Sequence, residues 1–254
     1  MTEQVISTLR DGVLRIQFNR PEKKNALTAA MYETIAGIME GAQSDDKVRV
    51  LLFTGTDECF TAGNDIADFL GAPQLTADSP VSHFLAILAS AEKPMVAAVR
   101  GDAVGVGTTM LLHFDLVYAG TSARFWLPFV NLALVPEAGS TLLLPLLAGY
   151  QKAAELMLLA EPFGPEEASE MGLVNKVVKD ADVESFAMEK AMALAAKPPV
   201  ALRRTRALLK AARGILPDIM EAEGEAFAEG LKSEEAQEAM LAFMERREAD
   251  FSKF

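Results

Sequence analysis

One local pattern recurs along this chain of 254 residues: a short apolar run, a turn rich in glycine, and a segment with helical periodicity. The apolar runs cover residues 48–54, 95–99 and 116–119, and turn-forming residues bound each of them. Uninterrupted apolar runs of this length are typical of strands that are buried on both faces. Strands that alternate with helices build largely parallel sheets, so the sequence predicts an α/β fold.

Other local signals extend this pattern. Asp11-Gly12 lies between two short apolar runs and predicts a tight turn that joins two strands. Thr28 can cap a helix, because its hydroxyl can accept a hydrogen bond from a free backbone N–H group. We also expect a helix over 82–91 and one late strand within 172–178. The stretch between the strand at 48–54 and the helix at 82–91 predicts a loop, because it contains Gly71, Pro73, Ser79 and Pro80.

The second half of the chain reads as mostly helical, with breaks at Pro198-Pro199 and at Pro217. We therefore expect a core domain over 1–195 and a C-terminal helical region over 196–254. That region carries many apolar side chains, which indicates a subunit interface in addition to ordinary packing.

Composition excludes several classes of function. The formal net charge of −12 disfavours nucleic-acid binding, because an acidic surface repels phosphate. No apolar run approaches the roughly 18 residues of a membrane helix, and the first residues do not resemble a signal peptide. The single cysteine, Cys59, fits a reducing compartment, so we expect a cytoplasmic protein with no membrane partner. His83 and His113 are isolated in the sequence, which gives no support for a metal site or a serine triad.

Two glycine turns are candidates for ligand binding: Gly63-Asn64 and Gly105-Val106-Gly107. Each follows an apolar strand and precedes a helix, whose first N–H groups have no partner within the helix. Two such turns side by side could direct N–H groups at one oxygen atom and form an oxyanion hole. The alternative is a pair of tight turns that bind nothing. The later glycine of a dinucleotide motif and the lysine of a phosphate-binding loop are both missing.

Glu137 is the candidate catalytic carboxylate. It follows Pro136 at a junction between a loop and a helix, among apolar residues. In the first turn of a helix it could simply complement the helix dipole. If the apolar neighbours surround it, its pKa rises toward the range that suits a general base. The residues alone leave both interpretations open.

Several motifs in order resemble the enoyl-CoA hydratase/isomerase (crotonase) superfamily over nearly the whole chain. The resemblance implies a crotonase-like fold of stacked β-β-α turns, with two roughly perpendicular sheets and a C-terminal helical region. It also implies an acyl-CoA substrate, no further cofactor, and homotrimers that often pair into hexamers. The motifs are FNRP at 18–21 with NAL at 25–27, FTAGNDI at 60–66, KPMVAAVRGDAVGVG at 93–107, FD at 114–115, LALVPEAGS at 132–140 and MGLVNKVV at 171–178.

Carried over by position, the resemblance implies that the N–H groups of Asn64 and Val106 bind the thioester oxygen. Lys23 and Lys24 would border the phosphates of coenzyme A (CoA). The remaining residues that the resemblance places around the bound CoA ester are Ala62, Asp65, Ile66, Gly105 and Phe129.

The chain departs from hydratases of this family at two positions. Where those enzymes carry catalytic glutamates, this sequence has Thr109 and Phe129. Neither side chain can activate water, so the pattern resembles peroxisomal-type 3,2-enoyl-CoA isomerases, which use a single acid at the position of Glu137. The expected function is double-bond isomerisation of an acyl-CoA, with Glu137, Asn64 and Val106 as the catalytic groups. A hydratase that uses Glu137 alone and a non-catalytic acyl-CoA-binding protein remain alternatives.

Overall fold

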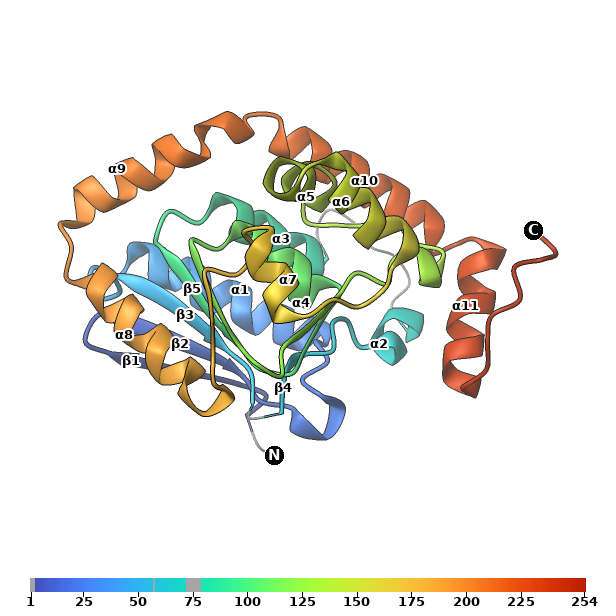
Figure 1. Cartoon of the computed structure of the whole chain (residues 1–254), viewed down its shortest axis with the longest axis horizontal. Coiled ribbons are helices and arrows are strands. Elements are labelled where there is room, and N and C mark those ends of the chain that lie inside the picture. Colours follow the sequence, from blue (N-terminus) through green and yellow to red (C-terminus); the bar gives the residue numbers. More distant parts are fainter. Residues whose placement is uncertain (1–2, 57, 72–78) are drawn as a thin grey trace.

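A computed structural model describes residues 3–56, 58–71 and 79–254 of the protein. It contains a six-stranded sheet in the order β1-β2-β3-β5-β7-β9 and a three-stranded sheet in the order β4-β6-β8 (Figure 1). The first two strands pair antiparallel around Asp11-Gly12, as the sequence predicts, and the later strand pairs are parallel. The strands are β1 Val5–Arg10, β2 Val13–Phe18, β3 Val50–Thr54, β4 Cys59–Thr61, β5 Met95–Val99, β6 Asp102–Val104, β7 Leu116–Gly120, β8 Arg124–Trp126 and β9 Lys176–Val178.

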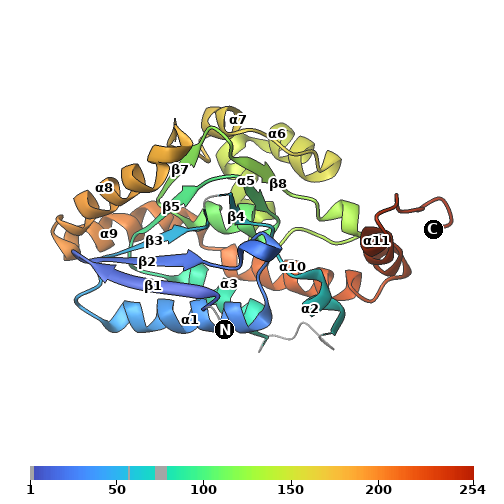
Figure 2. The ribbon, with the colours of Figure 1, turned by 90° about the horizontal axis from the view of Figure 1, so that it is seen from below.

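Helices cover both faces of the six-stranded sheet (Figure 2). On one face, Leu51 and Phe53 of β3 belong to the same apolar cluster as α1 (Ala29–Ser44) and α3 (Pro80–Ser90). On the other face, Val50 and Leu52 pack with α8 (Val183–Ala195). Because alternate side chains of this strand enter two different cores, it is apolar from Val50 to Phe53, as expected for burial on both faces.

The hydroxyl groups of Thr28 and Ser79 cap α1 and α3, the two helices on one face of the sheet. Thr28 accepts a hydrogen bond of 3.3 Å from Met31 N–H, which confirms the predicted cap of α1. Ser79 accepts one of 3.2 Å from Ser82 N–H, so α3 starts at Pro80, two residues before the predicted start. Of the predicted loop, Gly71 ends α2 (Ile66–Gly71), and residues 72–78, including Pro73, lie outside the described residues.

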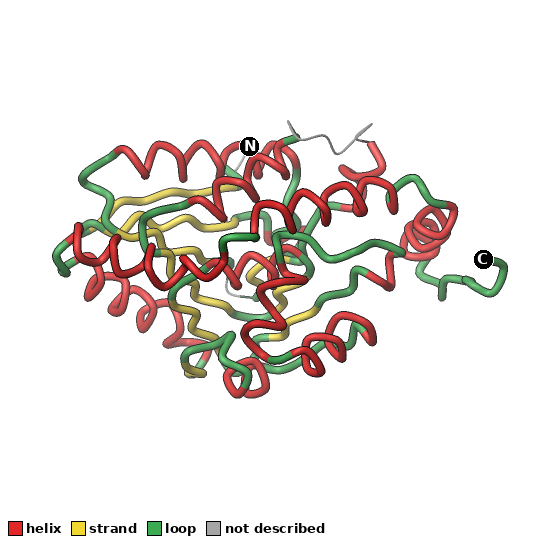
Figure 3. Tube along the Cα trace, turned by 90° about the horizontal axis from the view of Figure 1, so that it is seen from above, coloured by secondary structure: helices red, strands yellow, loops and turns green. Residues whose placement is uncertain are grey.

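The C-terminal helices run across one side of the core and are joined to it by polar contacts (Figure 1). Arg206 of α9 forms a 2.7 Å ion pair with Asp115, and Lys210 donates a 2.9 Å hydrogen bond to the carbonyl of His113. Figure 3 shows the last helix, α11, at one end of the molecule, away from the six-stranded sheet. The remaining helices are α4 Val106–Thr109, α5 Ser140–Ala148, α6 Tyr150–Ala154, α7 Pro165–Glu170, α9 Pro199–Lys210, α10 Leu216–Gly230 and α11 Glu234–Glu245.

The architecture confirms the expected α/β fold with two sheets and a helical C-terminal region. The predicted break at Pro198-Pro199 falls between α8 and α9, whereas Pro217 lies in the first turn of α10. Within the described residues, no helix has both the length and the apolar character that crossing a membrane requires.

Candidate active site

The two glycine turns lie side by side at the same edge of the three-stranded sheet. They follow β4 and β6, which pair in parallel, so the carboxyl ends of both strands meet there. Gly63 has a φ of +86°, and a Cβ atom at this position would lie 2.7 Å from the carbonyl oxygen of Val104 and 3.9 Å from the nitrogen of Gly105. Only glycine therefore allows the two backbones to approach this closely.

Two backbone N–H groups at these turns are unused. Within the described part of the chain, neither the Asn64 N–H nor the Val106 N–H has a hydrogen-bond acceptor. Val106 opens α4, so its N–H belongs to the first turn of a helix. The turns thus present two donors of the kind that an oxyanion hole requires.

Glu137 is a buried carboxyl group with one side-chain hydrogen bond. Its side chain is 6% exposed, and Thr109 Oγ1, at the end of α4, donates a hydrogen bond of 3.2 Å to its Oε1. Burial raises the pKa of Glu137 from its ordinary value of 4.5 to about 7, while the bond from Thr109 lowers it and the negative charge of Glu223 raises it. The predicted direction of the pKa shift is confirmed.

The prediction that Glu137 occupies the first turn of a helix is wrong. Helix α5 begins at Ser140, because Ala138 and Gly139 both have positive φ values, +62° and +68°, and form a left-handed turn. The carboxyl group of Glu137 therefore faces Thr109 rather than the N–H groups of α5. This favours the general-base interpretation over that of a dipole partner.

Tyr32, which the sequence analysis did not identify, connects the two parts of the site. Its hydroxyl bonds to Oδ1 of Asn64, which fixes the side chain next to one of the free N–H groups. Burial and the nearby Glu137 both raise the pKa of the Tyr32 hydroxyl well above its ordinary value. In the sequence, Tyr32 is distinguished by carrying a hydroxyl group on the otherwise apolar face of α1.

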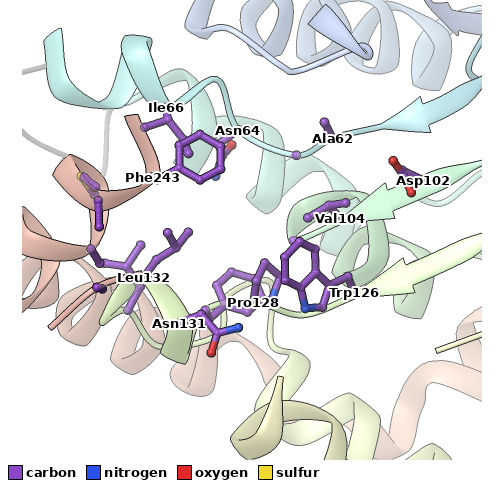
Figure 4. A pocket seen from close by; sticks show the side chains of 18 of the residues that line it. Ala62, Asn64, Ile66, Asp102, Val104, Trp126, Pro128, Asn131, Leu132 and Phe243 are labelled. Atoms are coloured by element: carbon purple, nitrogen blue, oxygen red, sulfur yellow. The ribbon is translucent and has the colours of Figure 1, made fainter. Parts of the chain in front are cut away.

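A cavity of about 460 Å³ opens beside the glycine turns (Figure 4). Ala62, Asn64 and Ile66 line it from the turn after β4, and Trp126 and Pro128 line it after β8. Among the other residues expected at the site, Lys24, Gly105 and Phe129 also line this cavity.

Three cationic side chains border this cavity: Lys24, Arg124 and Arg247. Arg124, which the sequence did not single out, pairs with Asp102 at 2.8 Å. Four expected residues do not line this cavity: Lys23, Asp65, Val106 and Glu137. Lys23 lies in an exposed single turn of 3₁₀-helix, Pro21–Lys23, and the Asp65 carboxylate forms a 2.6 Å ion pair with Arg20.

Glu137 opens onto a second cavity, of about 540 Å³, between α3 and α10. Val81 and Leu85 supply part of its apolar wall, and Phe227 of α10 lines both cavities. Phe129 is buried next to the glycine turn, with its ring 4.0 Å from where a Cβ atom of Gly105 would lie. The described residues contain no group of three or more histidine, cysteine or acidic side chains that could hold a metal ion.

Comparison with known proteins shows which family the chain belongs to. The sequence model of the enoyl-CoA hydratase/isomerase family matches residues 8–253. The chain is 33% identical to the rat protein Enoyl-CoA delta isomerase 2 over 96% of its own length, and it spans 64% of that relative. It is 30% identical to 2,3-dehydroadipyl-CoA hydratase of Escherichia coli over 99% of each chain.

Among solved structures, an enoyl-CoA hydratase/isomerase from Pseudoalteromonas atlantica superposes with a TM-score of 0.94. The two sequences are 39% identical, and the match covers 98% of this chain and 100% of that one. The match covers the glycine turns, the Glu137 loop and the C-terminal helices together, because it extends over nearly the whole chain. This chain therefore belongs to the enoyl-CoA hydratase/isomerase family.

Proposed function

We propose that the protein is an acyl-CoA double-bond isomerase, which converts a 3-enoyl-CoA into a 2-enoyl-CoA. One observation carries the proposal. Glu137 is a buried carboxyl group with a pKa of about 7, and Thr109 links it to the helix that opens with the free N–H group of Val106. A group with this pKa is ionised often enough to remove a proton and protonated often enough to return one.

In this mechanism the N–H groups of Asn64 and Val106 bind the thioester oxygen. Glu137 removes a proton from the α-carbon, and the electron pair delocalises into a dienolate whose negative charge rests on that oxygen. The protonated Glu137 then delivers the proton to the γ-carbon, which leaves the double bond between the α- and β-carbons. No atom is gained or lost, and no cofactor is required beyond the CoA of the substrate.

The side chains around the turn favour isomerisation over hydration. The Thr109 hydroxyl is hydrogen-bonded to Glu137, and the apolar ring of Phe129 is buried next to the glycine turn. Hydration needs a carboxylate to activate water, and Asp102, which lines the first cavity, is paired with Arg124. The apolar ring of Phe129 also keeps water away from the part of the dienolate at the glycine turn. Hydration is the second candidate function, because one of the relatives is a hydratase.

A turnover panel tests the proposal. The purified protein is given a 3-enoyl-CoA, a 2-enoyl-CoA and a ring-epoxide CoA ester, and the products are separated by chromatography. We expect a 2-enoyl-CoA from the first ester. Addition of water to the second ester without isomerisation of the first would make the protein a hydratase. Binding of every ester without exchange of the α-proton in heavy water would make it a non-catalytic binding protein.

The quaternary structure and location are part of the same proposal. We infer a homotrimer or a dimer of trimers, supported by exposed apolar side chains on the C-terminal region, which include Leu208, Leu209 and Ile215. Light scattering coupled to size-exclusion chromatography measures the mass directly. The proposed location is the cytoplasm, where a free thiol such as that of Cys59 stays reduced.

A further inference from the structure

The turn that carries Glu137 is held in place by α10, a helix of the C-terminal region. Gly139 has a φ of +68°, and a Cβ atom there would lie 2.2 Å from Cδ1 of Leu216 in α10. Helix α10 is therefore packed directly against this turn. No side chain near the start of α5 caps that helix from within its own segment. The Ser140 N–H bonds to the carbonyl of Glu137, whereas the N–H groups of Gly139 and Thr141 need an acceptor from another segment.

Glu223 of α10 supplies that acceptor. Its Oε2 accepts a 2.6 Å hydrogen bond from Gly139 N–H, and its Oε1 accepts one of 2.9 Å from Thr141 N–H and another from the Thr141 hydroxyl. Glu223 is itself buried, with 6% of its surface exposed. One carboxylate from the C-terminal region thus binds the backbone on both sides of Ser140.

These contacts determine which of the two neighbouring carboxyl groups is ionised. Burial raises the pKa of Glu223, but three donors converge on it, and hydrogen bonds to a carboxylate favour its charged form. Glu137 has one donor, Thr109. When two acids are close and their surroundings differ in this way, the one with more hydrogen-bond donors carries the charge and the other exchanges the proton.

Among the other ionisable groups that face the turn, His113 and Tyr32 stay neutral, while Glu221 and Glu225 of α10 line the same cavity as Glu137. His113 donates Nε2–H to the carbonyl of Ala138 at 2.7 Å, and burial lowers the pKa of its ring to about 4. Tyr32 of α1 has a pKa well above its ordinary value. Glu223 is the carboxyl group whose negative charge raises the pKa of Glu137.

We propose that Glu223 is a positioning residue for Glu137: it clamps the turn from α10 and is the fixed negative charge beside which Glu137 exchanges its proton. The inference rests on the proposed role of Glu137 as the proton carrier. It also assigns part of the active site to the C-terminal helical region. Glu223 shares one helix face with Leu216, Met220 and Phe227, at the spacing of an apolar stripe.

Two substitutions distinguish the effect of the charge of Glu223 from the effect of its position. Glu223→Gln keeps the length of the side chain and removes the charge, so the pKa of Glu137 falls and the acidic limb of the pH profile moves to lower pH by about one unit. Glu223→Asp keeps the charge but shortens the side chain, so we expect kcat to fall by about tenfold to 100-fold while the limb stays near its wild-type position. Glu229→Gln, an exposed glutamate on the same helix that lines neither cavity, is the matched control and should change neither quantity.

The pKa of Glu137 is also measured directly, from the carboxyl band that Glu137→Gln removes from the infrared difference spectrum. This readout does not require activity, so failure of the isomerase proposal and failure of the clamp are distinguishable. A Glu223→Gln protein that folds and leaves that pKa unchanged overturns the inference. If Glu223→Gln does not fold, Thr141→Val is tested instead, because it removes one of the three hydrogen bonds to Glu223. We expect kcat to fall by about threefold to tenfold with KM unchanged. A wild-type kcat would overturn the inference.

Discussion

Thr109 and Glu137 are joined by a hydrogen bond of 3.2 Å, which the threonine hydroxyl donates to Oε1 of the carboxyl group. Thr109 is fully buried at the end of α4, three residues after Val106. The bond therefore couples the proposed base to the helix that presents one of the proposed oxyanion donors. Each of the predictions below follows from the surroundings of Glu137 or from the two cavities next to it.

Replacing Glu137 with Gln should abolish isomerisation, because an amide cannot take and return a proton. We expect a loss of at least about 1000-fold in kcat, within the range of general acid–base contributions. Binding of a CoA ester, measured by calorimetry, should change by less than about threefold, because Gln fills the same volume. Retained isomerisation would exclude Glu137 as the proton carrier.

Replacing Thr109 with Val should move the acidic limb of the pH profile upward. The Thr109 hydroxyl stabilises the ionised carboxylate, so its loss raises the pKa of Glu137 further above 7. Activity should fall at pH 7 and recover at pH 9, as measured from kcat/KM across that range. Thr109→Ser, which keeps the hydroxyl, is the control and should follow the wild-type profile.

Glu137 should also lower the stability of the protein above neutral pH. Its pKa is about 7 in the folded protein and 4.5 ordinarily, so the folded state binds the proton more tightly. Below pH 4.5 both states are protonated, and Glu137 does not change the free energy of unfolding. That free energy falls by roughly 3 kcal/mol as the pH rises to 7 and beyond. Glu137→Gln should therefore raise the free energy of unfolding in urea at pH 8 and leave it nearly unchanged at pH 4.5. An equal effect at both pH values would contradict a raised pKa.

The second cavity should discriminate against acyl chains that end in a carboxylate. Glu221 and Glu225 line it together with Glu137 and Glu223, and its described lining contains no Lys, Arg or His side chain. Of two 3-enoyl-CoA esters of equal length, the one with a methyl end should have a kcat/KM at least about tenfold higher. Glu225→Gln and added salt should both reduce this ratio. Equal turnover of the two esters would show that the acyl chain does not enter this cavity.

Lys24 and Lys23 form a matched pair for testing the first cavity. Lys24 lines the cavity, whereas Lys23 does not. Lys24→Ala should raise KM for the CoA ester by roughly threefold to tenfold, because an exposed lysine contributes a modest attraction to phosphate. Lys23→Ala should leave KM unchanged, and equal effects of the two substitutions would contradict the assignment of this cavity to CoA.

Local sequence patterns predicted much of this molecule. The apolar runs at β3, β5 and β7 identified buried strands, because burial on both faces leaves no polar position in the strand. Gly63 and Gly105 identified the adjoining turns, because a Cβ atom at Gly63 would clash with the neighbouring backbone and Gly105 has a φ of +54°. The apolar neighbours of Glu137 predicted the direction of its pKa shift.

Other features depend on contacts between distant segments. Tyr32 and Glu223 are far from Glu137 in the sequence, and only the packing of α1 and α10 brings them to the site. The helix start at Glu137 was predicted wrongly because Pro136 signals a first turn, while the left-handed backbone of Ala138 and Gly139 delays α5 to Ser140. The prediction that both lysines lie near CoA stays a prediction, although Lys23 does not reach the cavity.

Phe227 forms part of the wall of both cavities, and this has a thermodynamic consequence. A ligand in one cavity that shifts the ring changes the shape of the other, so the two binding events share a coupling free energy. The affinity for a whole thioester then differs from the sum of what its nucleotide half and its acyl half contribute separately. The two cavities would in this way be coupled through a single aromatic side chain.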